Sequence, residues 1–388
     1  MARRTIRVGV LFGGQSSEHE VSLASAHSVM RALEACDDFE VVPIGITRSG
    51  RWLVGAEAHP ALIAQAKVRL GEPPPPPRDI SRGAEPVALL PDGGERALLP
   101  IREGGEARPV DVIFPVLHGP KGEDGTVQGF LELAGIPYVG SGVAASAVGM
   151  DKDLMKRLFR DAGLRTAEWI TVRKGRWKED RETVLREASR IGFPCFVKPA
   201  NLGSSVGIGK AKDGDGLARA IDEAALYDLK ILVERAVDAR EIECSVLGND
   251  DPRASVPGEV VSNREFYDYR AKYIDGASRL LIPAPIPPET AEEVRRVSVE
   301  AFRTLDCAGM ARVDFFLDRG TGELYINELN TIPGFTSISM YNKLWEASGV
   351  GYTELVVRLV QLALERYRER KDLDLSPRIG EADGEESA

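Results

Sequence analysis

The order of elements at the N-terminus places the strongest constraint on how this chain can fold. An apolar segment with strand character, residues 6–12, is followed by a Gly-Gly turn, an amphipathic helical segment over 18–35 and a second strand near 39–46. A strand, a glycine turn, a helix and another strand form the unit that opens parallel α/β domains. We therefore expect a parallel α/β domain over residues 1–142.

Periodicity is lost over residues 50–108, which contain five consecutive prolines at 73–77. This composition predicts an insertion with short strands and a stiff, extended spacer. Beyond it, the mixture of strands and helices predicts a central unit over 143–235 and a C-terminal unit over 236–372. The expected fold class is α/β to α+β in three parts, followed by an acidic, disordered tail over 373–388.

Composition narrows the class of protein further. The chain has 388 residues, of which 43% are apolar and 28% charged, and these values are ordinary for a globular protein. No apolar run reaches the roughly 18 residues of a membrane span, and the apolar segment after Arg4 is too short for a signal peptide. The net charge of −10 argues against a nucleic-acid partner.

The four cysteines are scattered singly along the chain, at positions 36, 195, 244 and 307. Without a CxxC pair or a cluster of histidines, neither a disulfide framework nor a zinc site is expected. We expect free, buried thiols in a reducing compartment, and hence a cytoplasmic protein with no membrane association.

Two short segments near the C-terminus, Arg312-Val-Asp314 and Glu328-Leu-Asn330, each place polar side chains two residues apart. Residues two apart lie on the same face of a strand, so a hairpin would gather Asp314, Glu328 and Asn330. Three oxygen donors without histidine or cysteine suit Mg²⁺. A solvated hairpin face is the alternative. Because the neighbouring residues are apolar, however, unpaired carboxylates would be costly there, and the pattern favours a metal site.

A second signal is Lys198, which ends a predicted strand and precedes a small-residue loop, residues 203–209. Backbone N–H groups in such a loop can cradle phosphates. The loop matches neither the Walker A sequence nor the GxGxxG fingerprint, and a plain turn would also explain it. Together with the carboxylates it indicates a nucleotide–Mg²⁺ site.

Two N-terminal loops, containing Glu18 and His118, follow predicted strands. Ligands of open α/β sheets bind beyond the carboxyl ends of the strands. Taken singly, Glu18 is explained by a helix cap or a dipole partner, and His118 by loop packing. A polar, aromatic segment over 263–278 is too long for an ordinary connection and predicts a lid.

Together these motifs resemble the D-alanine–D-alanine ligases of the ATP-grasp superfamily, over about residues 5–370. The resemblance depends on several separated segments: GGQSSEHEVSLASA, LHGPKGEDGTVQGF, FVKPANLGSSVGI, EFYDYRAKY, ARVDFF and YINELNTIPGFTSISMY. It implies an ATP-grasp fold with an N-terminal Rossmann-like domain. It also implies an ADP-forming ligase for peptidoglycan precursors, cell-wall biogenesis and cell shape.

The resemblance implies an ATP site between two sheets. The residues implied in nucleotide binding are Lys152, Lys198, Ser205, Glu234, Glu241 and Lys272. Glu234 would receive the adenine amino group, Glu241 the ribose hydroxyls, and the lysines the phosphates. Asp314, Glu328 and Asn330 would bind two Mg²⁺ ions, with Mn²⁺ as a substitute.

For the amino acids, the resemblance implies that Glu18 holds the first D-alanine's ammonium and that Arg312 and the Gly334 N–H stabilise the oxyanion. Ser339 and Met340 would lie where the second carboxylate binds. A hydrogen-bonded trio of Ser204, Glu18 and Tyr273 would hold the lid closed. Either Tyr273 or His118 would assist deprotonation of the second D-alanine, and the sequence leaves this choice open.

The sequence disfavours three alternative functions. Relatives that join D-alanine to D-lactate or D-serine have lids unlike EFYDYRAKY, and Tyr273 resembles the dipeptide-forming group. An NAD-dependent oxidoreductase fails because GxGxxG is absent. A non-catalytic nucleotide-binding protein is disfavoured because every candidate ligand residue is present. We expect D-alanine and ATP as small-molecule partners, and a homodimer by analogy with the relatives.

Overall fold

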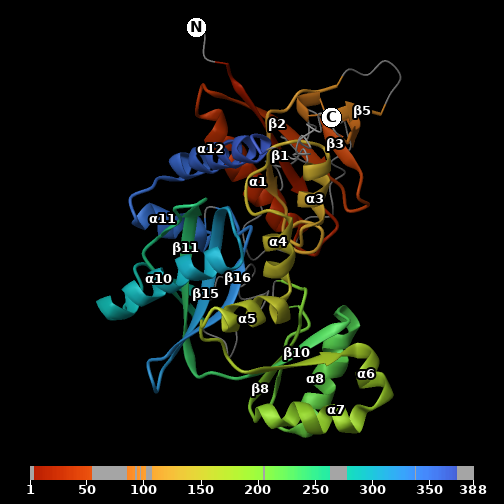
Figure 1. Ribbon diagram of the computed structural model, residues 1–388, viewed down its shortest axis with the longest axis vertical. Helices are drawn as coiled ribbons and strands as arrows, with labels where there is room; N and C mark the ends of the chain where they lie inside the picture. The colour runs from red at the N-terminus through yellow and green to blue at the C-terminus, as the bar shows by residue number, and fades with distance from the viewer. Residues whose placement is uncertain are drawn as a thin grey trace, which may run out of the picture.

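The computed structural model describes residues 4–54, 85–91, 94–96, 98–101, 107–203, 206–262, 278–336 and 338–373. The proline run, most of the predicted lid and the acidic tail lie outside these residues. Three sheets follow one another along the long axis of the molecule, each covered by helices (Figure 1).

The first sheet has the strand order β5-β4-β3-β2-β1-β6. Its elements are β1 (Ile6–Gly13), α1 (His19–Glu34), β2 (Phe39–Ile46), β3 (Trp52–Val54), β4 (Glu85–Leu89), the 3₁₀ turn Gly94–Arg96, β5 (Leu98–Pro100), β6 (Val112–Val116) and α3 (Thr126–Leu133). β1 pairs in parallel with both β2 and β6, as predicted. β3, β4 and β5 add an antiparallel extension, so the short strands of the insertion complete a mixed sheet.

The second sheet is antiparallel and has the order β7-β10-β8-β9. Its strands are β7 (Trp169–Arg173), β8 (Cys195–Pro199), β9 (Gly209–Ala211) and β10 (Lys230–Arg235). Its helices are α6 (Lys174–Glu179), α7 (Arg181–Ala188), the 3₁₀ turn Ser189–Ile191 and α8 (Gly214–Tyr227).

The third sheet is antiparallel and has the order β14-β13-β11-β15-β16, with β12 paired to β11. Its strands are β11 (Ala239–Gly248), β12 (Arg253–Ala254), β13 (Gly258–Ser262), β14 (Ser278–Leu281), β15 (Gly309–Asp318) and β16 (Leu324–Asn330). The helices of this part are α10 (Pro288–Thr304), α11 (Met340–Ala347) and α12 (Tyr352–Lys371).

The segment 143–163 has a continuous helical pattern, but the structure divides it into two helices, α4 (Val143–Met150) and α5 (Lys152–Asp161). Asp151 separates them because its backbone is extended and its carboxylate accepts the N–H groups of Asp153 and Leu154. Aspartate at such a position caps a helix start. The break places Lys152 at the first turn of α5.

The largest hydrophobic core joins the two ends of the chain. It contains Val10 and Phe12 of β1 together with Leu355 and Leu359 of α12, all fully buried. α12 therefore packs against the first sheet, as Figure 1 also shows, although its sequence follows the third. Among the described residues, no helix is both long and apolar enough to span a membrane.

Candidate active site

A cavity of about 670 Å³ is lined by residues of all three parts of the molecule. Most of the predicted site residues that the structure describes line it. These are Glu18, His118, Lys152, Lys198, Glu234, Glu241, Arg312, Asp314, Glu328, Asn330 and Gly334. Segments separated by more than 300 positions in the sequence therefore contribute to one site.

The β15–β16 hairpin supplies the carboxylates. Asp314 lies opposite Glu328, and Arg312 lies opposite Asn330, so the predicted convergence of these side chains is observed. The register shifts between Asp314 and Phe315. Bulges of this kind redirect side chains and are frequent beside active sites.

The bulge brings Asn327 to the cavity next to Glu328, which strict alternation along a strand does not predict. The sequence does contain a signal for it. Ile326 and Leu329 are both buried but stand three residues apart rather than two. Asn327 Oδ1 accepts from Lys198 Nζ at 3.4 Å, so the additional residue also contacts the lysine of the second sheet.

Arg312 lies between two carboxylates. Its guanidinium donates to both oxygens of Asp314, at 2.6 and 2.7 Å, and lies 3.0 Å from Glu243, a residue not singled out from the sequence. Burial acts to lower the pKa of Arg312, but Asp314 and Glu243 outweigh it and raise the pKa well above the usual value. Arg312 is therefore a permanent, oriented cation in the cavity.

The lysines come from α5 and β8. Lys152 Nζ lies 3.3 Å from Glu328 and donates to the Leu202 carbonyl at 2.9 Å. Lys198 Nζ donates to Glu234 Oε1 at 2.7 Å. Lys152 and Lys198 are both largely buried, so the cavity concentrates positive charge near the hairpin carboxylates.

Glu234 is held by a second lysine that was not singled out from the sequence. Lys156, one turn after Lys152 on α5, is fully buried and lies 2.6 Å from Glu234 Oε2. Burial acts to raise the pKa of Glu234, but Lys156 and Lys198 together hold the pKa below the usual value. The side chain is therefore an ionised acceptor. Glu241 lines the same cavity from β11.

Glu18 and His118 lie at the first sheet's edge of the cavity. Glu18 is 8% exposed, and a Cβ on Gly203 would lie 3.2 Å from its Oε2, so the start of the glycine-rich loop reaches Glu18. His118 Nδ1 lies 3.2 Å from the Ile332 carbonyl, and Nε2 lies 3.3 Å from Ser25 Oγ. Burial lowers the pKa of His118, and Glu18 only partly offsets this, so the imidazole is neutral.

Glu123 is a further carboxyl group in the cavity, and it was not singled out from the sequence. Its Oε2 accepts the Gly119 N–H at 2.5 Å. Burial and then the charge of Glu18 raise the pKa of Glu123 to about 8, so it is mainly protonated at neutral pH.

The loop after β16 contains Gly334, which lines the cavity, and leads to Ser339. A Cβ on Gly334 would lie 2.8 Å from Ser339 Oγ, so only glycine fits beside this serine without a shift. Ser339 also accepts the Thr336 N–H at 3.0 Å and precedes the buried Met340 of α11. Ser339 is not among the described residues that line the cavity. Ser204, Ser205, Lys272 and Tyr273 lie outside the described residues.

The residues present fit a divalent cation and a nucleotide. Among the described residues, no group of three or more His, Cys, Asp or Glu side chains is placed to hold a metal. Two carboxylates and one amide meet at the hairpin instead, a sparse oxygen set of the kind that Mg²⁺ shares with phosphate oxygens. The buried lysines beside them suit those phosphates.

Comparisons with known proteins agree with this geometry. Residues 7–141 match the family model described as D-ala D-ala ligase N-terminus, and residues 158–361 match D-ala D-ala ligase C-terminus. A D-alanine–D-alanine ligase of Thermoanaerobacter sp. is 50% identical over 366 residues, covering 94% of this chain and 98% of that protein. One of Heliobacterium modesticaldum is 51% identical over 375 residues, covering 96% and 97%.

Solved structures give the same result. The D-alanine–D-alanine ligase of Coxiella burnetii has a TM-score of 0.81 at 34% identity, covering 95% of this chain and 96% of that one. The VanG D-Ala:D-Ser ligase of Enterococcus faecalis has a TM-score of 0.80 at 34% identity, covering 93% and 100%.

The fold and the cavity between its sheets define an ATP-grasp protein. Within that class, the chain belongs to the D-alanine–D-alanine ligase family.

Proposed function

We propose that this protein joins two D-alanine molecules to D-alanyl-D-alanine and converts ATP to ADP and phosphate by way of an acyl phosphate. The observation that carries this proposal is the single cavity in which buried lysines, paired carboxylates and Arg312 meet Glu18. Relatives about 50% identical over nearly the whole chain are D-alanine–D-alanine ligases.

The chemistry explains why such a site is needed. A carboxylate does not react with an amine at neutral pH, because oxide would have to leave. The first D-alanine's carboxylate oxygen therefore attacks the γ-phosphorus, ADP leaves, and an acyl phosphate results. The second D-alanine's amine then attacks the acyl carbon, phosphate leaves with its electron pair, and the amine's extra proton is lost.

This chain's residues would divide the work as follows. Lys152 and Lys198 bind the phosphates, and Glu18 orients the first D-alanine through its ammonium. The oriented cation of Arg312, with the Gly334 N–H, stabilises the oxyanion of the tetrahedral intermediate. Asp314, Glu328 and Asn330 would hold Mg²⁺, or Mn²⁺ in its place, and the ion when bound neutralises phosphate charge.

We infer that His118 positions the site rather than accepting the proton. Both of its ring nitrogens lie within hydrogen-bond distance of protein groups, Ile332 O and Ser25 Oγ. With Nδ1–H donating to the carbonyl, Nε2 accepts from the serine and neither nitrogen is available to an amine. This leaves Tyr273 as the candidate for assisting deprotonation.

A second candidate function is ligation of D-alanine to D-serine or D-lactate. It is favoured by the likeness to the D-Ala:D-Ser ligase structure. Incubation of D-alanine with equimolar D-serine or D-lactate, followed by mass spectrometry, tests the choice. We expect D-alanyl-D-alanine to dominate at neutral pH, and a dominant mixed product would reassign the second substrate.

The cellular setting is also proposed. D-Alanyl-D-alanine is a peptidoglycan precursor, so we place the enzyme in cell-wall synthesis and the maintenance of cell shape. The four free cysteines suit the cytoplasm.

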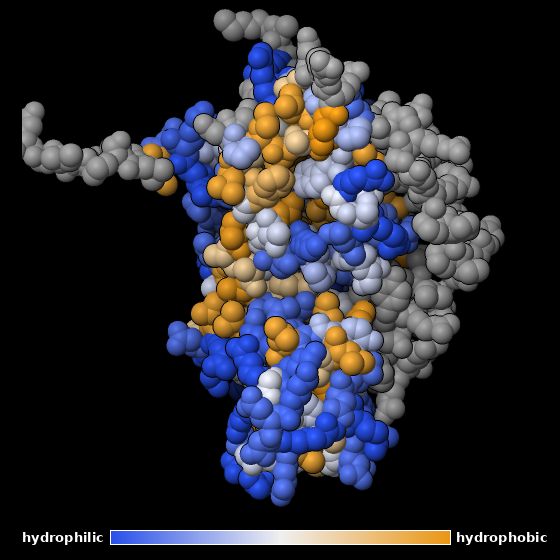
Figure 2. All heavy atoms as spheres, turned by 90° about the vertical axis from the view of Figure 1, so that its right-hand side faces the viewer, coloured by the Kyte–Doolittle hydropathy of each residue, from blue (hydrophilic) through white to orange (hydrophobic). Residues whose placement is uncertain are grey.

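We further propose a homodimer. Hydrophobic residues gather on the upper part of the face in Figure 2, and α3 exposes 70% of Leu133. Light scattering tests this assembly.

A further inference from the structure

The start of the glycine-rich loop, residues 200–203, is fixed from two sides, and we call this segment the loop base. The Lys152 N–H donates to the Ala200 carbonyl at 3.0 Å, and Lys152 Nζ donates to Leu202 O at 2.9 Å. On the other side, the Ala200 N–H donates to the Lys230 carbonyl at 2.9 Å. The loop base therefore connects the first residue of α5 to the first residue of β10.

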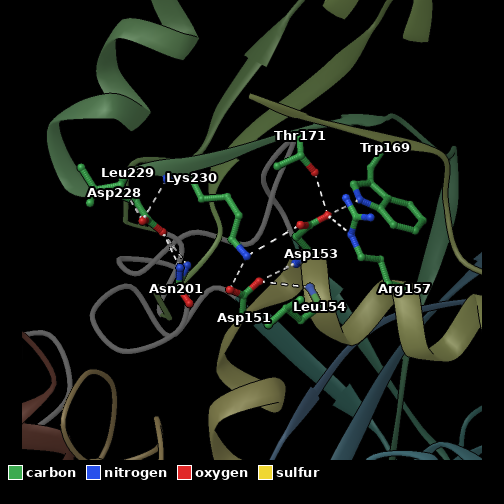
Figure 3. A network of polar contacts seen from close by, with 10 residues as sticks. All are labelled: Asp151, Asp153, Leu154, Arg157, Trp169, Thr171, Asn201, Asp228, Leu229 and Lys230. Carbon is green, nitrogen blue, oxygen red and sulfur yellow. Dashed lines mark hydrogen bonds and ion pairs between the residues drawn. The ribbon is translucent and has the colours of Figure 1, made fainter. Parts of the chain in front are cut away.

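Asp228, just after α8, holds the loop base directly. Its Oδ2 accepts the Asn201 backbone N–H at 2.7 Å and the Asn201 side-chain amide at 3.0 Å. Its Oδ1 accepts the N–H groups of Leu229 at 2.6 Å and Lys230 at 3.1 Å (Figure 3). One carboxylate thus joins the loop base to the start of β10. Four N–H donors make this a strong, directional attachment.

Lys230 links the start of β10 to the start of α5. Its buried ammonium forms an ion pair with Asp151 and lies 3.7 Å from Asp153 (Figure 3). Asp151 is also the cap of α5, so the same ion pair fixes the helix turn that begins with Lys152. Removing one partner of a buried pair leaves an uncompensated charge, so this geometry is strongly held.

The end of α8 also contacts the far side of the loop. Gly207 has φ +71°, and a Cβ there would lie 2.7 Å from Tyr227 Cδ2 and 3.0 Å from Pro199 Cγ. Tyr227 therefore packs against Gly207 in the second half of the loop, while its neighbour Asp228 holds Asn201 in the loop base. Glycine is needed at this position for both its backbone conformation and its size.

We propose that Asp228 and the Lys230–Asp151 pair are positioning residues that set the loop base against Lys152 and thereby determine the affinity for the nucleotide phosphates. None of the three lines the cavity, so they act through Lys152 and the loop rather than on substrate. This inference rests on the proposed function, because it assigns the loop and Lys152 to ATP.

The test compares two aspartates at opposite ends of the same helix. Asp228→Ala should raise KM for ATP about tenfold, which corresponds to the loss of about 1.4 kcal/mol. We expect kcat and KM for D-alanine to change less than KM for ATP, because only Gly203 of the loop base reaches Glu18, whereas Lys152 bonds to the loop base directly. Asp213→Ala is the control, because Asp213 caps the start of α8 by accepting the Gly216 N–H at 2.7 Å, away from the loop base.

Calorimetric titration with Mg²⁺–ADP should show about tenfold weaker ADP binding for Asp228→Ala and unchanged ADP binding for Asp213→Ala. Asp228→Asn replaces Asp228→Ala in this comparison if the alanine variant has a lower melting temperature than Asp213→Ala. The asparagine keeps the side-chain volume and one acceptor oxygen. A KM for ATP that matches the Asp213 variant overturns the inference. An inactive but folded wild-type protein instead overturns the proposed function, and the ADP titration still decides the role of Asp228.

Discussion

The Glu123 carboxyl lies in the cavity beside Glu18, and its protonation depends on that neighbour. Burial, followed by the Glu18 charge, raises its pKa to about 8. In the unfolded chain the group ionises near 4.5. The folded state therefore binds a proton more tightly than the unfolded state between these values, and Glu123 makes the protein less stable as pH rises through this window.

Glu123→Gln should remove this pH dependence, since the amide mimics the protonated acid. The difference in free energy of unfolding, variant minus wild type, should increase by roughly 3 kcal/mol between pH 5 and pH 8. Above this range the difference should level off. Urea denaturation of the ligand-free protein at four pH values measures it. A difference that does not change with pH would contradict the assignment.

Glu328 is the carboxylate on which the proposed metal site depends most, because both oxygens of Asp314 already accept from Arg312. Glu328→Gln should lower kcat roughly 100-fold, as expected when a charge that acts in the transition state is lost. Glu323→Gln, in the turn just before the same strand, should change kcat less than twofold. Near-normal turnover of Glu328→Gln at ordinary Mg²⁺ would reject the metal assignment.

At the scale of elements, three segments meet at His118: the loop after β6 that contains it, α1 and the loop after β16. Its imidazole lies between α1, through Ser25, and the loop after β16, through Ile332. Ser25 Oγ also accepts the Phe335 N–H at 3.2 Å. This connection holds the segment of Gly334, which lines the same cavity as Arg312, although Ser25 itself does not line it.

Ser25→Ala should therefore destabilise the protein by about 1–3 kcal/mol, because the buried Phe335 N–H loses its acceptor. Ser189→Ala is the control, since the Ser189 hydroxyl donates only to the preceding turn, at Leu185. Chemical denaturation provides the comparison. Equal stability of the two variants would show that the connection through Ser25 contributes nothing.

Most helices and strands that position the site could be predicted from the sequence, but two local backbone features could not. Strand and helix patterns predicted β1, α1, β2 and the hairpin of β15 and β16, because period-two and helical patterns are local. They missed the break at Asp151 and the bulge that turns Asn327 toward the cavity. A capped break and a bulge depend on single backbone conformations that apolar periodicity does not encode.

The candidate site divides in the same way. Residues within recognisable motifs, such as Lys198 and Asp314, were singled out from the sequence, and both line the cavity. Lys156 and Glu243 were not, because each acts by pairing with a residue distant in sequence, Glu234 and Arg312 respectively. Such partners become visible only when helices and strands from different parts of the chain are brought together.

At the scale of the whole molecule, the two chain ends share one core. Leu359 of α12 is fully buried in a cluster that includes Val10 of β1. The first sheet and the loop of Gly334, which leads into α11, are thus parts of one packed unit. This unit holds Glu18 at a fixed position relative to Arg312.

Leu359→Ala should cost about 2–5 kcal/mol in unfolding free energy, the usual range for a large-to-small change in a core. Hydrogen exchange should also become faster in β1, distant in sequence, because the two share the cluster. Leu226→Ala, at a side chain that is 71% exposed, is the control. Faster exchange confined to α12 would contradict a shared core.

The central claim is tested most directly by supplying the purified protein with ATP, Mg²⁺ and D-alanine alone. Phosphate and D-alanyl-D-alanine, the latter identified by mass spectrometry, should be formed in equal amounts. L-alanine in place of D-alanine should give neither product. Phosphate release without dipeptide, or equal rates with the two enantiomers, would contradict the account.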